Sequence, residues 1–169
     1  MNRVSSFMSF LDHCKRNHAC GRPVDKQDGS GKTWLHKACA SNDTAAFDWL
    51  LDQGANVNIP DNAGRTALHE AARSGNAHMI RRLFDMGALH IDQTTGDKPI
   101  HNAVDFRNAH VLPLFSNFVN EHGALGWTPL MIAAKHNYLR CIEVLLQLGA
   151  SVNLSTRYGY TALIAASKS

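Results

Sequence analysis

A short pattern of residues returns five times along the chain, and this repetition constrains the fold more than any other feature. The copies are GKTWLHKACASND at residue 31, GRTALHEAARSGN at 64, GDKPIHNAVDFRN at 96, GWTPLMIAAKHNY at 126 and GYTALIAASKS at 159. The third residue of each copy lies at position 33, 66, 98, 128 or 161, so the steps are 33, 32, 30 and 33 residues. A period in this range is typical of a solenoid, in which each repeat is one small supersecondary unit.

Each repeat contains two short amphipathic segments, and neither is long enough to form a stable helix alone in water. The first segment is rich in alanine, which lets neighbouring helices approach closely. The second has the apolar spacing of a core-facing helix, as in AAFDWLLDQGA, HMIRRLFDMGA, HVLPLFSNF and RCIEVLLQLGA. Gly54, Gly87 and Gly149 follow three of these segments, where a left-handed C-terminal cap favours glycine. The stretches between repeats, such as VNIPDNAG, supply turn residues for a projecting hairpin.

These residues resemble the ankyrin repeat family, whose signature includes Thr-Pro-Leu-His-x-Ala at a period near 33. The resemblance covers nearly the whole chain, and residues 61–88, DNAGRTALHEAARSGNAHMIRRLFDMGA, match it best. It implies an all-α solenoid of stacked helix–turn–helix units with projecting β-hairpin loops. Within one domain, residues 1–169, we expect an N-terminal cap with a helix over 1–27. The repeats are expected to start near residues 28, 61, 93, 123 and 156, the last incomplete.

Two stretches look like nucleotide-binding or catalytic motifs but belong to the repeat. GSGKT at 29–33 ends like a phosphate-binding loop, yet that loop needs a glycine where Lys26 stands. His69 and Glu70 begin like a zinc-protease helix, which needs a second histidine where Arg73 stands. We therefore predict no nucleotide, no cofactor and no catalytic residues in this chain.

Histidines recur at the repeat period, at positions 36, 69 and 101, which indicates a structural role. The resemblance implies that each one hydrogen-bonds around the junction between helix and hairpin, helped by the preceding threonine. Repeat three has Lys98 in place of this threonine, and repeats four and five have Met131 and Ile164 in place of the histidine. We expect these three junctions to lose the polar network and the third to be the least regular.

The N-terminal stretch DHCKRNHAC contains four residues of metal-binding type, His13, Cys14, His18 and Cys20. Their spacing matches no common zinc finger, and no second half-site follows. We interpret the stretch as a capping helix with incidental thiols and predict no metal; a metal site is the alternative. The cysteines of the chain form no CxxC pair, which favours free thiols and a location in the cytoplasm or nucleus.

The charge and hydropathy of the chain exclude several classes of partner. The formal net charge is +3, and Lys and Arg are scattered instead of forming the basic stripe that binds nucleic acid. No stretch approaches the roughly 18–20 apolar residues of a membrane span, and the N-terminus lacks the apolar run of a signal peptide. We expect a monomer that binds neither nucleic acid nor membrane.

Residues that break the repeat pattern give a solenoid its individual binding properties, because the framework positions are shared. They lie at the expected hairpin tips and on the exposed side of each first helix. The aromatic ones suit rigid interface anchors, although Trp34 could instead pack on a neighbouring hairpin, and Trp49 could be exposed or covered by the N-terminal segment. The predicted partner-binding residues are Trp34, Lys37, Arg65, Glu70, Arg73, Phe106, Arg107, Leu125, Trp127, Lys135, His136, Tyr158 and Tyr160.

Two parts of the chain depart from the regular repeat. In repeat three Pro113 falls inside the second helix and the closing Gly-Ala is missing, so we expect a distorted or shortened helix there. The fifth repeat, GYTALIAASKS, contains only a first helix and leaves an apolar side without a partner helix. We favour a piece of a longer chain over an unusual terminal cap.

The sequence predicts a non-enzymatic scaffold that binds a protein or peptide partner along the concave surface of hairpins and first helices. The alternative is the targeting arm of a larger enzyme or of a pathogen effector inside a host cell, with its other domain beyond residue 169. A third possibility follows from the family, whose members are known substrates of asparagine hydroxylation. Asn58, Asn120 and Asn153 lie in VN hairpin settings, and Asn58 and Asn153 each have a leucine eight residues earlier.

Overall fold

The computed structural model describes residues 10–19, 21, 23–89 and 96–167. Every regular element in this described part is a helix, which confirms the predicted all-α class. The expected β-hairpins contain no strand within these ranges; they are loops closed by turn hydrogen bonds, such as the one from the Asp61 N–H to the Arg65 carbonyl at 2.7 Å. The α-helices are α1 (Phe10–Ala19), α2 (Trp34–Ser41), α3 (Thr44–Asp52), α4 (Ala67–Ser74), α5 (Ala77–Asp85), α6 (Pro99–Asp105), α7 (Pro129–Lys135), α8 (Leu139–Gln147) and α9 (Ala162–Ala166), and the 3₁₀ helices are η1 (Ala109–Phe118) and η2 (Ala124–Gly126).

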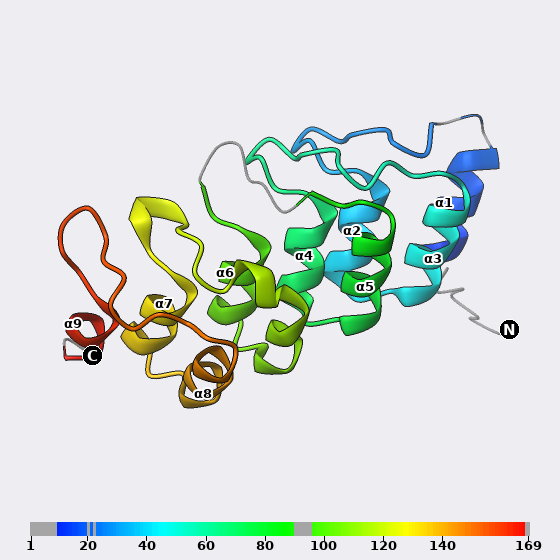
Figure 1. Ribbon diagram of the computed structural model, residues 1–169. Coiled ribbons are helices and arrows are strands. Elements are labelled where there is room, and N and C mark those ends of the chain that lie inside the picture. Colours follow the sequence, from blue (N-terminus) through cyan, green and yellow to red (C-terminus); the bar gives the residue numbers. More distant parts are fainter. Residues whose placement is uncertain (1–9, 20, 22, 90–95, 168–169) are drawn as a thin grey trace, which may run out of the picture.

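The helices form two rows that run side by side through the molecule (Figure 1). In the first row α2, α4, α6, α7 and α9 contact one another in this order. The second row contains α1, α3, α5, η1 and α8; α3, α5, η1 and α8 each contact the first-row helix that precedes them in the chain. The helix α1 packs against α3 and so occupies the place of the predicted capping helix. This stack of helix pairs is the predicted solenoid.

Buried histidines join the first three helix pairs to the loop of the next. The N–H of Thr33, the N-cap of α2, donates to Nδ1 of His36 at 3.2 Å, and Thr66 and His69 repeat this bond at 3.0 Å in α4. Because Nδ1 accepts, the ring hydrogen is on Nε2. The Nε2–H of His36 therefore donates to the carbonyl of Arg65 in the next loop, at 3.0 Å. The predicted structural role of these histidines is confirmed.

The third junction keeps more of this network than the sequence predicts. The Lys98 N–H donates to Nδ1 of His101 at 3.1 Å, and Nε2 of His101 donates to the Trp127 carbonyl at 3.1 Å. The prediction of a lost network is wrong here, because the histidine contacts use the backbone of residue 98 and not its side chain.

In the fourth junction the sulfur of Met131 accepts weakly from the Thr128 N–H at 3.5 Å. A thioether has no hydrogen to donate, so that junction loses the bond to the next loop, as predicted. Ile164 has no polar side-chain atom either, so the fifth helix start keeps only the bond from the Ile164 N–H to Oγ1 of Thr161, at 3.4 Å.

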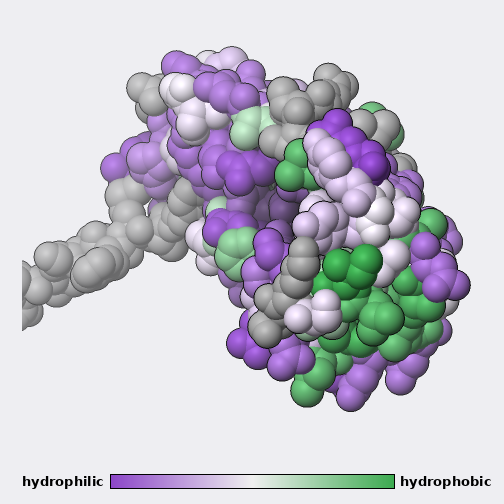
Figure 2. Space-filling model, turned by 90° about the vertical axis from the view of Figure 1, so that its left-hand side faces the viewer, coloured by the Kyte–Doolittle hydropathy of each residue, from purple (hydrophilic) through white to green (hydrophobic). Residues whose placement is uncertain are grey.

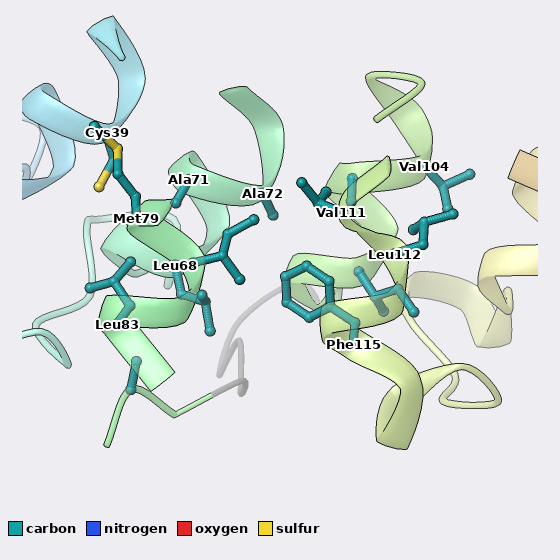
Figure 3. Close-up of a cluster of buried hydrophobic side chains, with 14 of the residues drawn as sticks. Cys39, Leu68, Ala71, Ala72, Met79, Leu83, Val104, Val111, Leu112 and Phe115 are labelled. Atoms are coloured by element: carbon teal, nitrogen blue, oxygen red, sulfur yellow. The ribbon is translucent and has the colours of Figure 1, made fainter. Parts of the chain in front are cut away.

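The core runs between the two rows as one continuous apolar cluster. First-row helices contribute small side chains such as Ala71 and Ala72, and second-row helices contribute bulky ones such as Met79, Leu83 and Phe115, all of them fully buried (Figure 3). Alanine at the contact lets first-row neighbours approach closely, while the large side chains fill the space between the rows at the density of a protein interior. The predicted division between thin first helices and bulky second helices is confirmed.

Repeat three has the distorted second helix that Pro113 predicts. The helix η1 is 3₁₀ rather than α, and its backbone leaves the helical region at Phe115, where φ is −111° and ψ is 23°. Proline lacks the N–H for an α-helical bond, and its ring crowds the carbonyl four residues earlier. Phe115 nevertheless enters the core, where its ring meets that of Phe84 edge-on at 5.5 Å.

Successive loops lie against one another and form a row beside the first-row helices. The Asn62 N–H donates to the Ser30 carbonyl at 3.0 Å, and the Asn62 side chain donates to the Gly29 carbonyl at 3.1 Å. Gly31 has a φ of +77°, and a Cβ at this position would lie 2.6 Å from the Asn62 nitrogen. Glycine is required here both for its left-handed backbone and for the close approach of the two loops.

Candidate protein-binding surface

Cations lie over aromatic rings at several places on the surface, and most of the predicted partner-binding residues take part. The pairs are Lys37 over Trp34 at 4.8 Å, Arg73 over Phe106 at 5.3 Å, Arg107 over Tyr138 at 5.1 Å, Lys135 over Trp127 at 5.3 Å and Arg157 over Tyr158 at 4.9 Å. Each exposed pair contributes about 0.5–1 kcal/mol. Pairing also orders long side chains before a partner arrives, which lowers the entropy cost of binding.

Glu70 lies at the centre of an ion cluster and not on the surface predicted for it. Its side chain is only 2% exposed; Oε1 accepts from Nζ of Lys32 and Oε2 from Nε of Arg73, both at 2.8 Å. Burial raises the pKa of Glu70, but the hydrogen bonds and charges of Lys32 and Arg73 outweigh it and leave the pKa lowered. The predicted exposure of Glu70 is therefore wrong. It positions Arg73, which covers the ring of Phe106.

The Glu70→Ala variant is expected to lose about 2 kcal/mol of unfolding free energy, because two charge-assisted hydrogen bonds disappear. The loss stays moderate because Lys32 and Arg73 are partly exposed and regain water. Urea denaturation measures it. The matched control is Glu143→Ala, since Glu143 pairs with Arg140 at 2.9 Å on an exposed surface and its loss should cost less than about 0.5 kcal/mol. Equal losses in the two variants would contradict the assignment.

The two N-terminal tryptophans pack against α1. The ring of Trp34 is half-buried and meets His13 of α1 edge-on at 5.0 Å, whereas the packing alternative placed it on a neighbouring hairpin. The Lys37 ammonium lies over the same ring at 4.8 Å. Trp49 is half-buried and meets His18 at 5.7 Å. Of the two alternatives for Trp49, the structure shows the one in which the N-terminal segment covers it.

A cleft of about 220 Å³ opens between the loop that contains η2 and the end of α7. Leu125 and Trp127 line it from the loop, and Lys135 and His136 line it from α7 and its C-cap; we call it the Trp127 cleft. Leu125 is 64% exposed and has a φ of +56°, a left-handed conformation that costs an L-residue about 1–2 kcal/mol. Trp127 is half-buried, with the ring of Tyr160 at 6.4 Å. Four predicted residues of repeat four therefore line one cleft, and Tyr160 of repeat five lies beside one of them, Trp127.

Four further residues complete the lining of the Trp127 cleft and were absent from the predicted set: Asp97, Asp105, Ala124 and Ile132. Ile132 stands in the register of Glu70, a variable position of the first helix, so the alignment of the repeats contained a signal for it. Asp105 is the last residue of α6. Its approach to the cleft depends on how α6 packs on α7, which no single repeat encodes.

Phe106 and Tyr158 expose aromatic rings outside the Trp127 cleft. Phe106 is the C-cap of α6 and is 53% exposed beneath Arg73. Tyr158 lies on the loop before α9, is 69% exposed and carries Arg157 over its ring. Both rings remain free on one face, as an interface anchor requires.

Two predicted arginines lie apart from the cleft. Arg65 is held within its own loop by two hydrogen bonds to Oδ2 of Asp61, from Nε at 3.3 Å and Nη2 at 3.1 Å. Arg107 covers Tyr138 and lines a hollow between η1 and α8. The fold does not bring either guanidinium to the Trp127 cleft.

Comparison with known protein families agrees with this geometry. The family model described as ankyrin repeats (3 copies) matches residues 4–95 and 100–169, which is most of the chain. The chain belongs to the ankyrin repeat family. Ankyrin repeats are in general protein-interaction modules and not enzymes. No curated protein is similar enough to this ankyrin repeat chain to count as a relative.

The ankyrin loops hold Asn58 and Asn153 in different surroundings. The side chain of Asn58 donates to the Gly87 carbonyl at 3.2 Å and accepts from the Leu89 N–H at 2.8 Å. Asn153 is exposed. Hydroxylation of either residue stays a prediction, with Asn153 the more accessible substrate.

The N-terminal residues of metal-binding type have other contacts. His13 and His18 pack against tryptophans, and Cys14 is buried. Cys20, the fourth member of that cluster, lies outside the described residues. Among the residues that the structure does describe, no three His, Cys, Asp or Glu side chains gather as metal ligands.

None of the helices in the described part of the chain has the length and apolar character to cross a membrane.

Proposed function

We propose that this ankyrin repeat protein is a non-enzymatic scaffold that binds a protein or peptide partner through the Trp127 cleft and the exposed rings of Phe106 and Tyr158. The observation that carries the proposal is Leu125, an apolar side chain held in water by an unfavourable backbone conformation. Such strain is concentrated at functional sites. A partner that covers Leu125 gains about 25 cal/mol for each Å² of apolar surface removed from water.

The charges around the cleft favour a partner of mixed polarity. Asp97 and Asp105 contribute carboxylates to the lining, and Lys135 and His136 contribute cationic or titratable nitrogens. A partner segment with one apolar anchor between polar groups of both signs fits this arrangement. Nucleic acid does not, because its phosphates require contiguous cations.

We also propose a monomer in the cytoplasm or nucleus that needs no metal or cofactor. The cysteines support a reducing compartment, because Cys14, Cys39 and Cys141 are buried free thiols. Burial raises the pKa of Cys14 to about 11 and also raises the pKa of Cys39 and Cys141, so these thiols stay protonated and unreactive at neutral pH.

Affinity capture from a lysate, with mass-spectrometric identification, supplies a partner for the decisive test. The Leu125→Ala variant is expected to weaken the affinity for that partner about tenfold, and Trp127→Ala about thirtyfold, as central anchors do. The matched control is Leu139→Ala, because Leu139 is equally exposed but lies at the start of α8. The proposal fails if Leu125→Ala binds like the wild-type chain, or if Leu139→Ala weakens binding as much.

A further inference from the structure

A groove of about 510 Å³ lies between η1 and α8, the second helices of repeats three and four, and we call it the η1–α8 groove. Both of its walls are helices inside the stack, so its opening does not depend on where the sequence ends. Among the residues described around it, no aspartate or glutamate belongs to the lining. The lining includes three basic residues, Arg107, His110 and Arg140, and three apolar ones, Pro113, Val144 and Leu148.

The charge of this lining distinguishes the η1–α8 groove from the apolar end of the stack. Figure 2 shows hydrophobic residues gathered at the C-terminal end, where the described lining of the hollow is uncharged. In the η1–α8 groove, His110 is held by a 2.8 Å hydrogen bond from its Nε2 to the Gly75 carbonyl. Arg107 and Arg140 also line a smaller hollow of about 140 Å³ at the start of α8. The two guanidiniums therefore share one stretch of surface.

Arg107 stands at a backbone position where three other repeats have asparagine or glycine. The equivalent residues are Asn42, Gly75 and Asn137, each nine residues after the third residue of its repeat. All four positions have a left-handed backbone, with φ from +53° to +73°. Glycine and asparagine adopt this conformation readily, whereas a longer side chain is unfavourable there. Such strain is concentrated at functional sites, which indicates a role for the guanidinium of Arg107.

The guanidinium of Arg107 keeps hydrogen-bond donors for a ligand. It lies over the ring of Tyr138 at 5.1 Å and forms no ion pair with any residue that the structure describes. A guanidinium that stacks on a ring by its face still presents N–H groups along its edges. Stacking also restricts the long side chain before a ligand arrives, which lowers the entropy cost of binding.

The gap between α3 and α5 shows what η1 lacks. His78, the second residue after the N-cap of α5, lies 3.1 Å from Oδ1 of Asp48, the fifth residue after the N-cap of α3. The equivalent positions across the η1–α8 groove are Arg140 and Pro113. Proline supplies no carboxylate, so Arg140 pairs with Glu143 of its own helix, at 2.9 Å on an exposed surface. The carboxylate that bridges α3 and α5 is therefore missing between η1 and α8.

We propose that the η1–α8 groove binds an acidic segment of a partner protein. A carboxylate of the segment accepts hydrogen bonds from Arg107 and Arg140, and a neighbouring apolar side chain packs on Pro113, Val144 and Leu148. Guanidiniums bind carboxylates through paired, charge-assisted hydrogen bonds, which fix the orientation of the segment. Two guanidiniums beside an apolar floor do not suit nucleic acid, whose phosphates require contiguous cations. The groove shares no lining residue with the Trp127 cleft, so this is a second binding surface.

Phage display of short random peptides on the wild-type chain tests this chemistry. Counter-selection on a double variant, Arg107→Asn with Arg140→Ala, removes the peptides that bind elsewhere. The peptides that remain are expected to share an aspartate or glutamate next to an apolar residue. A labelled synthetic copy of the most enriched sequence should bind the wild-type chain in fluorescence anisotropy. Exchange of its acidic residue for the matching amide should weaken binding about tenfold.

Variants of the chain separate binding from folding. Arg107→Asn should weaken binding of the labelled peptide about tenfold, while Tm stays close to that of the wild-type chain because asparagine suits the left-handed backbone. Arg140→Ala should also weaken binding, and Glu143→Ala should strengthen it about threefold, because Glu143 no longer competes for Arg140. The matched control is Arg157→Ala, which removes an arginine that lies over another tyrosine outside the groove. That control and Leu125→Ala should both bind the peptide normally, which separates this site from the proposed function.

Selection of acidic peptides that depend on both arginines supports the proposal. It is overturned if no peptide survives the counter-selection, if the amide peptide binds as tightly as the acidic one, or if Arg157→Ala weakens binding as much as Arg107→Asn. It is also overturned if the two arginines instead bind phosphatidylserine vesicles, or if sedimentation shows self-association of the wild-type chain that Arg107→Asn abolishes.

Discussion

Replacing Phe115 with alanine is expected to lower the free energy of unfolding by about 4 kcal/mol. Phe115 is fully buried between the two rows, and its ring contacts Phe84 edge-on at 5.5 Å. The surrounding helices pack on both sides of η1, so the cavity left by the ring can close only in part. The loss therefore combines the transfer free energy of the ring with a cavity term. Urea denaturation followed by circular dichroism measures it.

The control for this prediction is Phe106→Ala, which removes the same side chain from an exposed position. Phe106 is 53% exposed and its main partner is the guanidinium of Arg73. Its removal should cost less than about 1 kcal/mol of stability, the contribution of an exposed cation–aromatic pair. A similar loss in both variants would mean that η1 is not packed as described.

Lowering the pH from 7.5 to 5.5 is expected to destabilise the protein through its junction histidines. Burial lowers the pKa of His36 and His101, against the opposing effects of nearby carbonyls and carboxylates. Below the ordinary value of about 6.5 the unfolded chain binds protons that the native rings do not, so stability falls as the pH falls. Each histidine contributes a slope of up to about 1.4 kcal/mol per pH unit, down to its lowered native pKa. Urea denaturation at pH 7.5, 6.5 and 5.5 gives this slope.

The His36→Met variant isolates the contribution of one ring. Methionine already stands at the equivalent position 131, where its sulfur accepts the N-cap N–H, so the helix start tolerates it. The variant should be less stable at pH 7.5, because the bond from His36 to the Arg65 carbonyl is lost. Its stability should also change less with pH than that of the wild-type chain. An unchanged slope would show that His36 does not titrate as proposed.

The period near 33 residues and the alternation of thin and bulky segments predicted the stack, the histidine junctions and the distortion at Pro113. The stack and the histidine junctions depend on contacts between neighbouring repeats, and such contacts recur along the chain, so several repeats of the sequence carry the same signal. The distortion at Pro113 was predictable for another reason, because a proline inside a helix disrupts its backbone wherever it stands. The Trp127 cleft was predicted in part, because Leu125, Trp127, Lys135 and His136 are variable positions of adjacent segments.

Only the tertiary structure decided which of the variable residues are available to a partner. Glu70 was expected at the surface, but Lys32, 38 residues earlier in the chain, caps its carboxylate. The sequence left open whether Trp49 is exposed; in the structure His18 of α1 packs against its ring. In each case the exposure of a side chain depends on what a neighbouring repeat places beside it. The sequence by itself determined the repeating framework, because the buried positions of a solenoid recur at a fixed period. The exposed surface was decided by the tertiary structure, because it depends on contacts between unlike residues of different repeats, and these contacts do not recur along the sequence.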